Sequence, residues 1–449
     1  MSNGRLCTYD EYRSSGVEWI GDVPKEWEVL ATARVTDLTT GDSDTQDAVE
    51  EGEYPFFVRS PTIEGSNKFL FDGEGVLTSG DGAGVGKIFH HHIGKFDFHQ
   101  RVYLFHNFRR VTGRYCFYFL REHLHRVVLA GNAKSTVDSL RRPMLRMFPI
   151  CLPSVEEQET IAEFLDYETA KIDALIKKQQ QLIALLGEKR QAVISHAVTK
   201  GLNPNAPMRD SGVEWLGEVP EHWEITRLKY AMSPKRNAFV DGPFGSNLKS
   251  EHFVDDGTVF VIESGFATSG QLDESKLKRI SEQHFATVSR SEACEGDIII
   301  AKIGARYGMS SILPKLSSKA LVSGNSLKLT MDSETMNVEY AHAFLQVLKA
   351  CAAMDDDVNV TAQPALSLGG LKKILFLRPP LDEQAAIVAQ LAERKGKLDD
   401  LIDSALLLSE TLRERRTALI SAAVTGKIDV RGWKRPSAVP KKKSEMEVA

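Results

Sequence analysis

Three short stretches contain residue types that catalytic sites use, but none matches a catalytic pattern. Gly80–Lys87 is glycine-rich, yet it lacks the spacing of a phosphate-binding loop, and Ile88 stands where Ser or Thr would bind Mg²⁺. His90–His92 could offer imidazoles to a metal, but alternate side chains of a strand face opposite ways, so only two could share an ion. Glu274–Lys276 has the Glu-x-Lys spacing of nuclease sites, which is common by chance. The sequence therefore predicts no catalytic residue and no metal site.

The net charge of −5 hides a strong local asymmetry. Residues 87–150 contain twelve basic and three acidic side chains, a local charge of +9, whereas residues 1–86 carry a charge of −11. A basic surface on an otherwise acidic domain is typical of proteins that bind a polyanion such as nucleic acid. The alternative is that several of these arginines lie on a solvated helix around 115–126, which would reduce the excess without abolishing it.

Side chains with hydrogen-bond donors can contact DNA phosphates and base edges. In the N-terminal half, our candidates are Arg59, Lys87, His99, Gln100, Arg101, Lys134 and Arg141. In the C-terminal half, they are Lys235, Arg236, Asn247, Lys249, Lys302, Arg306 and Asn325. Lys302 and Arg306 rank highest because they flank the glycine turn at Gly304, which has a counterpart in the first half. We expect a minority of the set to touch DNA.

The chain is a tandem duplication. Residues 16–28 recur as 212–224 at a constant offset, and residues 153–198 recur as 379–424 without a gap. Each copy therefore has a variable segment followed by a constant one. We predict globular domains over 1–151 and 203–378, constant segments over 152–202 and 379–433, and a basic, disordered tail over 434–449.

The two constant segments have the pattern of long helices. Residues 155–198 contain no proline, and apolar residues recur at heptad spacing in both copies. The predicted coiled-coil seam consists of Leu165, Ile172, Leu175, Leu182, Leu186 and Val193 in the first helix, and of Leu391, Leu398, Leu401, Leu408, Leu412 and Leu419 in the second. The predicted fold class is α+β, with two α/β domains separated by two long antiparallel coiled-coil helices in a pseudo-twofold tandem repeat.

Other features of the sequence exclude whole classes of protein. No apolar run approaches the roughly 18–20 residues that a membrane span needs. The first thirteen residues have no hydrophobic centre of a signal peptide, and the five cysteines stand far apart. We therefore expect a cytoplasmic protein with no membrane segment and no disulfide scaffold.

Several motifs resemble conserved regions of the specificity subunits of type I restriction–modification systems. The resemblance extends from Gly16 to about Trp433 and rests on the duplicated segments Gly16–Trp27, Gly212–Trp223, Pro153–Gln158 and Pro379–Gln384. Three further stretches resemble parts of target-recognition domains in that family: Tyr54–Ser60, Gly94–Tyr103 and Asp241–Ser250.

The resemblance implies a non-catalytic subunit whose two target-recognition domains each read one half of a bipartite DNA sequence. The helices are expected to set the spacing between the half-sites and to dock two modification subunits. It implies no cofactor in this chain, with S-adenosylmethionine on the methyltransferase subunits and ATP and Mg²⁺ on the restriction subunits of the assembly. Double-stranded DNA is the expected ligand.

Two alternatives belong to other classes of protein. A stand-alone nuclease or methyltransferase would cut or methylate DNA without another subunit, but the motifs of such enzymes are missing. A coiled-coil interaction scaffold would carry two binding domains for protein or glycan. Sequence-dependent DNA binding in the presence of a modification subunit distinguishes the specificity subunit from that scaffold.

Overall fold

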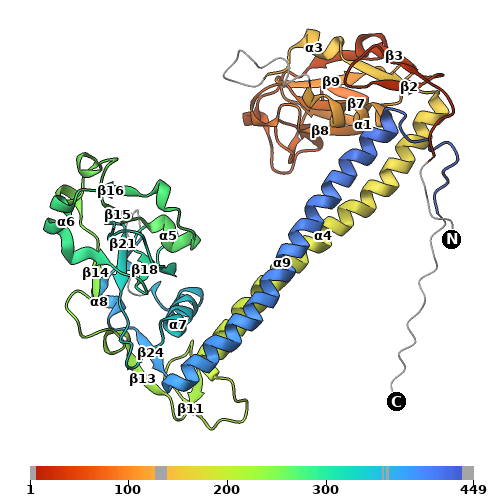
Figure 1. The fold of residues 1–449 in the computed structure, drawn as a ribbon. Helices are drawn as coiled ribbons and strands as arrows, with labels where there is room; N and C mark the ends of the chain where they lie inside the picture. Colours follow the sequence, from red (N-terminus) through yellow and green to blue (C-terminus); the bar gives the residue numbers. More distant parts are fainter. Residues whose placement is uncertain (1–6, 127–138, 356–357, 360–363, 437–449) are drawn as a thin grey trace, which may run out of the picture. The chain divides into compact units, whose positions relative to one another are not determined.

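The computed structural model describes residues 7–126, 139–355, 358–359 and 364–436. Within these ranges the chain forms two compact units, one drawn from residues 1–180 and 406–449 and the other from residues 181–405. Two long helices, α4 (Val155–Lys200) and α9 (Leu381–Val424), each contribute one end to each unit (Figure 1). The fold class is α+β, as predicted, with a globular α/β domain in each unit.

The first unit contains a six-stranded sheet in the order β4-β9-β7-β8-β5-β6. Its strands are β4 (Asp37–Thr40), β5 (Tyr54–Phe57), β6 (Ile63–Ser66), β7 (Phe71–Ser79), β8 (Phe89–Phe98) and β9 (Val102–His106). Leu77 lies in a buried cluster on one face of the sheet, while its neighbour Val76 packs with helix α1 (Gly113–His123) on the other. Residues 115–120 of α1 are all buried, whereas Arg121 and Arg126 are exposed. The alternative of a solvated helix is therefore wrong for residues 115–120, but it holds for these two arginines.

Smaller elements complete the first unit. Strand β1 (Tyr12–Ser14) pairs with β2 (Asp22–Pro24), and β3 (Glu28–Ala31) pairs with β10 (Pro149–Leu152), both antiparallel. Short helices lie between the strands: η1 (Thr32–Arg34), η2 (Thr45–Asp47), η3 (Gly82–Gly84) and α3 (Arg142–Arg146). Since β10 leads directly into α4, the strand pair fixes where the long helix begins.

The second unit has two four-stranded sheets, in the orders β14-β21-β18-β19 and β16-β15-β20-β17. Their strands are β14 (Phe239–Asp241), β15 (Val259–Ile262), β16 (Lys278–Ile280), β17 (Glu292–Ala293), β18 (Ile298–Ala301), β19 (Ser310–Ile312), β20 (Ala320–Val322) and β21 (Ser326–Leu329). Three two-stranded pairs accompany them: β11 (Met208–Asp210) with β12 (Glu218–Pro220), β13 (Glu224–Arg227) with β24 (Leu375–Arg378), and β22 (Val358–Asn359) with β23 (Ala365–Leu366). The pairs β11–β12 and β13–β24 repeat β1–β2 and β3–β10 of the first unit.

Helices of the second unit include one counterpart of α1. They are η4 (Leu228–Tyr230), η5 (Gly245–Asn247), η6 (Ser250–His252), α5 (Ser264–Ser269), η7 (Glu274–Lys276), α6 (Glu282–Val288), η8 (Ser289–Ser291), α7 (Val338–Ala350) and α8 (Leu368–Leu371). Of these, α7 matches α1. Each carries a buried tyrosine whose hydroxyl donates to a carbonyl near the end of a long helix, Tyr115 to Val424 and Tyr340 to Val198. Each also begins at a residue whose side chain accepts from a backbone N–H of the first turn.

The duplicated tryptophan motif docks onto the start of each long helix. In the first unit, Trp27 Nε1 donates to Glu157 Oε2 at 3.3 Å. In the second, Trp223 Nε1 donates to Glu383 Oε2 at 3.0 Å. Both indoles are buried, so each needs a partner for its N–H. These contacts explain why the Trp motif and the Glu-Gln motif recur together in the two copies.

The two long helices run antiparallel within each unit. In the first unit, the Tyr115 hydroxyl lies 2.9 Å from the carbonyl of Cys151, just before α4, and 3.0 Å from that of Val424, at the end of α9. In the second, Tyr340 donates to the carbonyl of Val198 at 3.1 Å, at the end of α4. Further along, ion pairs join the helices, Asp173 with Arg416 in the first unit and Asp399 with Arg190 in the second.

The seam between the helices differs from the prediction at four positions. The predicted residues that are buried are Leu165, Ile172, Leu391, Leu398 and Leu412, and those that are partly buried are Leu186, Val193 and Leu419. The prediction is wrong for Leu175, Leu182, Leu401 and Leu408, which are between 43% and 54% exposed. The second series of the seam lies one residue later, at the partly buried Ile176, Ile183 and Ile402. A heptad seam alternates steps of three and four residues, and the prediction chose the wrong step.

Both long helices end at a glycine. Gly201 and Gly426 follow the helices with φ of +76° and +71°, the left-handed conformation of a helix C-terminus. Beyond α9, Trp433 packs against Phe164 and Tyr167 of α4 in the first unit. Most of the predicted tail, residues 437–449, lies outside the described residues. Among the helices that the structure describes, none combines the length and the apolar composition of a membrane span.

Glu122, near the end of α1, makes the stability of the first unit depend on pH. Burial raises its pKa from the usual 4.5 to about 7, and the nearby cations Arg416, Arg121 and Arg126 only partly oppose this. Between these two pKa values the folded state holds a proton that the unfolded state releases, so this contribution to stability is lost as the pH rises through the window. We expect Glu122→Gln to raise the melting temperature over wild type by more at about pH 8 than at about pH 5. A difference that does not change with pH would contradict this assignment.

Candidate nucleic-acid interface

Four of the candidate residues in the first unit lie where β5 ends and β9 begins. Arg59 follows β5, and His99, Gln100 and Arg101 form the connection between β8 and β9. Two of them, Arg59 and Arg101, contact Asp81, which follows β7. These segments are far apart in the sequence, and the pairing of Phe57 with Phe98 and of Ser79 with Val102 brings them together.

Asp81 contacts two arginines. Its Oδ1 accepts from Arg59 Nη1 at 2.9 Å, and its Oδ2 accepts from Arg101 Nη1 at 2.6 Å. Burial acts to raise the pKa of Asp81, but the hydrogen bonds and positive charges of both arginines outweigh it and hold that pKa below its usual value. Asp81 is therefore ionised at neutral pH, and the cluster of one carboxylate and two guanidiniums carries one net positive charge.

The backbone of Arg101 is held on both sides. Its N–H donates to Nδ1 of His99 at 2.9 Å, and its carbonyl accepts from the N–H of Gly80 at 2.8 Å. A Cβ at position 80 would lie only 2.8 Å from that carbonyl oxygen, which explains the glycine. His99 is buried, and burial lowers its pKa, so at neutral pH the ring is neutral and its Nδ1 can accept the N–H of Arg101. The exposed Gln100 donates to Asp44 at 2.7 Å.

The second unit contains a matching cluster around Asp241 at the end of β14. Its Oδ2 accepts from Lys302 Nζ at 2.9 Å, and its Oδ1 accepts from Arg290 Nη2 at 2.9 Å. The Lys302 ammonium also lies 4.2 Å from the centre of the Phe244 ring. Lys302 directly follows β18, the strand that corresponds to β7 in the repeat. Each domain therefore places one carboxylate between two cations near its glycine turn, although the residues do not occupy equivalent positions of the repeat.

The other candidates are spread over the two units. Lys87 and Arg141 are exposed in the first unit, and Lys134 lies outside the described residues. In the second unit, the exposed candidates away from the Asp241 cluster are Lys235, Arg236, Asn247, Lys249 and Arg306. Lys249 pairs with Glu251 at 3.4 Å, and the exposed Asn325 accepts from the Lys302 N–H through its carbonyl at 2.8 Å. Asn325 therefore belongs to the Asp241 cluster.

Sequence reasoning missed Asp81, Asp241 and Arg290. It selected cations and amides as DNA contacts and gave no role to a carboxylate. One signal was available: Asp81 and Lys302 both lie in the glycine turn that the two halves share. Arg290 has no such signal, because its contact with Asp241 depends on the packing of η8 against β14.

The basic excess of residues 87–150 is partly neutralised by distant acids. Arg109 pairs with Asp37 at 2.8 Å, and Arg114 pairs with Asp166 of α4. The hydrogen bonds from Arg109 and Asn107 lower the pKa of Asp37 to about 2. Because these arginines form ion pairs within the first unit, they are less available to a polyanion than the sequence suggests.

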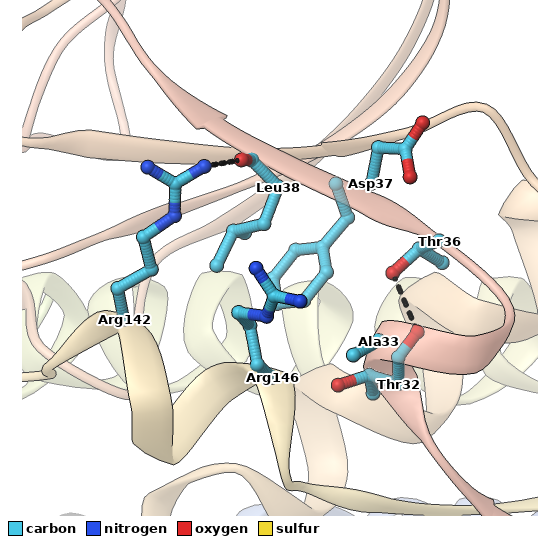
Figure 2. Close-up of a pocket in the computed structure, with 8 residues that line it drawn as sticks. Thr32, Ala33, Thr36, Asp37, Leu38, Arg142 and Arg146 are labelled. Carbon is cyan, nitrogen blue, oxygen red and sulfur yellow. Dashed lines mark hydrogen bonds between the residues drawn. The ribbon is translucent and has the colours of Figure 1, made fainter.

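Two further cations line a small hollow beside Asp37. It has a volume of about 220 Å³, and Figure 2 shows Arg142 and Arg146 of α3 facing β4 across it. Arg142 donates to the carbonyl of Leu38, which fixes its guanidinium against the strand. Both arginines are exposed, and the register of β4 with β9 places Asp37 beside His106, at the end of β9 away from Arg101. The hollow therefore lies at the other end of β9 from Arg101 and Asp81.

The three histidines of β8 divide between the two faces of the strand. His90 and His92 both lie against the ring of Phe57, while Nε2 of His91 contacts Glu74 at 2.8 Å. The expectation that only two could share a face is confirmed. Within the ranges that the structure describes, no group of three or more His, Cys, Asp or Glu residues could hold a metal ion.

Comparison with known proteins finds a family model that matches part of the chain and several similar proteins. Residues 24–184 match the family model of the type I restriction modification DNA specificity domain. The chain is 29% identical to the type I restriction enzyme EcoDI specificity subunit of Escherichia coli over 286 residues, 58% of this chain and 63% of that protein. It is 23% identical to the EcoKI specificity subunit of Escherichia coli K12 over 376 residues, 81% of this chain and 75% of that protein.

A solved structure shares the fold. A chain of a type I R-M system superimposes with a TM-score of 0.64 at 13% identity, over 90% of this chain and 98% of that one. The family model covers residues 24–184, from β2 through the globular part of the first unit and along α4 as far as Ala184. The duplication repeats the same organisation in the second unit. Over residues 24–184 the chain thus matches the type I restriction modification DNA specificity domain, and over most of its length it is similar to specificity subunits of type I restriction enzymes.

Proposed function

We propose that this chain is the DNA-recognition subunit of a type I restriction–modification complex. Each recognition domain reads one half of a bipartite target, and α4 and α9 set the distance between the halves. The observation that carries the proposal is that each domain has a carboxylate paired with two cations: Asp81 with Arg59 and Arg101, and Asp241 with Lys302 and Arg290. Clustered, partly exposed cations on related domains favour contact with DNA.

In this proposal the chain binds DNA in the cytoplasm and contributes no catalytic group. Two modification subunits supply S-adenosylmethionine-dependent methylation, and restriction subunits supply ATP- and Mg²⁺-dependent cleavage. The test is to mix the full chain, the modification subunits and S-adenosylmethionine with DNA, singly and together. We expect methylation only when both proteins are present. Methylation or cleavage by the chain alone would support the stand-alone enzyme, and sequence-independent behaviour of the complete mixture would support the scaffold.

The exposed leucines beside the seam are the proposed docking positions for the modification subunits. Leu175 and Leu408 are exposed in the first unit, and Leu182 and Leu401 are exposed in the second. The constant offset of the repeat makes Leu175 equivalent to Leu401, and Leu182 equivalent to Leu408. Each unit thus has the same pair of apolar side chains on its helices, which favours two equivalent sites and hence two modification subunits.

We expect Leu175→Glu to weaken the binding of modification subunits by about tenfold or more, because it places a charge in an apolar interface. The matched control is Gln180→Glu, an exposed position of the same helix on the opposite flank of the seam by heptad position. Titration of the chain with modification subunits, followed by light scattering, measures both. Equal affinities for the two variants would contradict the docking assignment.

A further inference from the structure

Each recognition cluster contains a carboxylate where a simple phosphate-binding surface would have none. Asp81 lies between Arg59 and Arg101, and Asp241 lies between Lys302 and Arg290. A carboxylate repels phosphate and cancels one positive charge of its cluster, so it lowers electrostatic affinity for the DNA backbone. Its benefit must come from the directions in which it holds the neighbouring donors.

In each cluster one cation is an exposed arginine. The side chain of Arg101 is 59% exposed and that of Arg290 is 64% exposed, whereas the carboxylates between the cations are only 23% and 15% exposed. The second cations, Arg59 and Lys302, are less exposed than the arginine of their own cluster, and each neutralises the carboxylate from another side. The arginine therefore reaches solvent with one guanidinium nitrogen fixed, and its remaining donors have no partner among the residues that the structure describes.

In each cluster the backbone of one cation is held by hydrogen bonds on both sides. Arg101 has its N–H and its carbonyl bonded to His99 and Gly80. Lys302 has its N–H bonded to the carbonyl of Asn325 at 2.8 Å and its carbonyl bonded to the N–H of Leu366 at 2.9 Å. In the first domain the supported residue is Arg101 itself, and in the second it is Lys302, which holds Asp241 beside Arg290. A side chain that discriminates between bases must be held in a defined position, whereas flexible surface cations need no such support to contact phosphate.

We propose that Asp81 and Asp241 are positioning residues that orient Arg101 and Arg290 toward guanine in the major groove. An arginine reads guanine through paired hydrogen bonds to O6 and N7, which requires a defined orientation of the guanidinium plane. Each half of the target then contains a G·C pair whose recognition depends on the carboxylate of its own domain. This inference rests on the proposed DNA-recognition function and adds the base that is read and the residues that fix the reader.

The test compares binding to preferred and to unrelated duplexes. The full chain with its modification subunits is presented with a duplex library in which both halves of the target are randomised, and the selected and unselected duplexes are then titrated. For Asp81→Asn we expect the affinity for the preferred duplex to fall about tenfold to hundredfold, with loss of a guanine preference at one position of one half. Affinity for unrelated duplexes rises, because the variant has lost a negative charge. Asp241→Asn has the same effects in the other half.

Matched controls remove one negative charge elsewhere in each domain. Asp37→Asn removes the ion-pair partner of Arg109, at the other end of β9 from Arg101. Glu224→Gln removes the ion-pair partner of Arg378 on the strand pair β13–β24. Both controls are expected to leave base preference unchanged. Arg101→Lys keeps the charge and is expected to lose the guanine preference while affinity for unrelated duplexes stays at the wild-type value.

Two outcomes would overturn the inference while leaving the proposed function intact. In one, Asp81→Asn and Asp241→Asn retain the guanine preferences of wild type. In the other, they lose affinity for preferred and unrelated duplexes alike, as a merely structural ion pair predicts. If the wild-type complex selects no sequence from the library, the proposed function fails, and this inference fails with it.

Discussion

Replacement of Pro24–Leu152 with the corresponding segment of another specificity subunit is expected to change one half of the DNA target completely. The other half and the spacing between them should remain. The replaced segment begins at the end of β2, ends with β10 and includes the Asp81 cluster. Preference for the original half-site should fall by about a thousandfold or more, the ratio that separates specific from non-specific DNA binding. Mapping of methylated adenines in DNA modified by the hybrid complex measures the change.

The donor segment must retain the contacts that anchor the domain to the helices. These are the Trp27 contact with Glu157 and the Tyr115 contact with the end of α9. The reciprocal control replaces Pro220–Arg378, the equivalent block of the second unit, and should change only the other half. If either exchange altered both halves or the spacer, the assignment of one half-site to each domain would be wrong.

Loss of the buried glutamine at the start of a long helix is expected to give the largest fall in stability. Gln158 accepts from the N–H of Thr112 at 2.8 Å and donates to the carbonyls of Arg110 and Pro153 at 2.9 and 3.0 Å. Leucine has a similar volume, but Gln158→Leu leaves three buried or partly buried backbone hydrogen bonds without their partner. At about 1–3 kcal/mol for each unsatisfied group, we expect the free energy of unfolding of the first unit to fall by about 3–6 kcal/mol.

Gln384 offers the same test in the second unit. It accepts from the N–H of Asn337 at 2.7 Å and donates to the carbonyls of Thr335 and Pro379 at 3.0 and 2.7 Å. Gln384→Leu should therefore destabilise the second unit by a similar amount. Urea denaturation followed by circular dichroism measures both variants, with the exposed Gln180→Leu as a control expected to change stability by less than about 0.5 kcal/mol. A loss below about 1 kcal/mol for the buried glutamines would show that these hydrogen bonds do not anchor the domains.

The sequence predicts the arrangement of the chain well because the evidence for it is repeated at fixed spacing. The offset of residues 153–198 to 379–424 locates both long helices, and α4 begins at Val155 as expected. The choice of seam could not be made in the same way. In the first helix Leu175 and Ile176 are both apolar, so either spacing forms a heptad, and only packing distinguishes them.

The candidate DNA contacts could be predicted only in part, because their surroundings depend on distant residues. Arg59 and Arg101 were selected from their type, but the carboxylate between them was not. Arg109 seemed equally available in the sequence until the fold paired it with Asp37, 72 residues away. Which cations remain available to DNA thus depends on tertiary ion pairs, which residue type and local charge do not reveal.

The central claim is that the two domains of this chain read two halves of one DNA target. The most direct measurement is single-molecule sequencing of DNA methylated by the full chain with its modification subunits, which locates every modified adenine. The claim predicts one asymmetric target made of two specific segments separated by a spacer of fixed length and unspecified sequence. A single continuous target, or methylation without sequence preference, would contradict it.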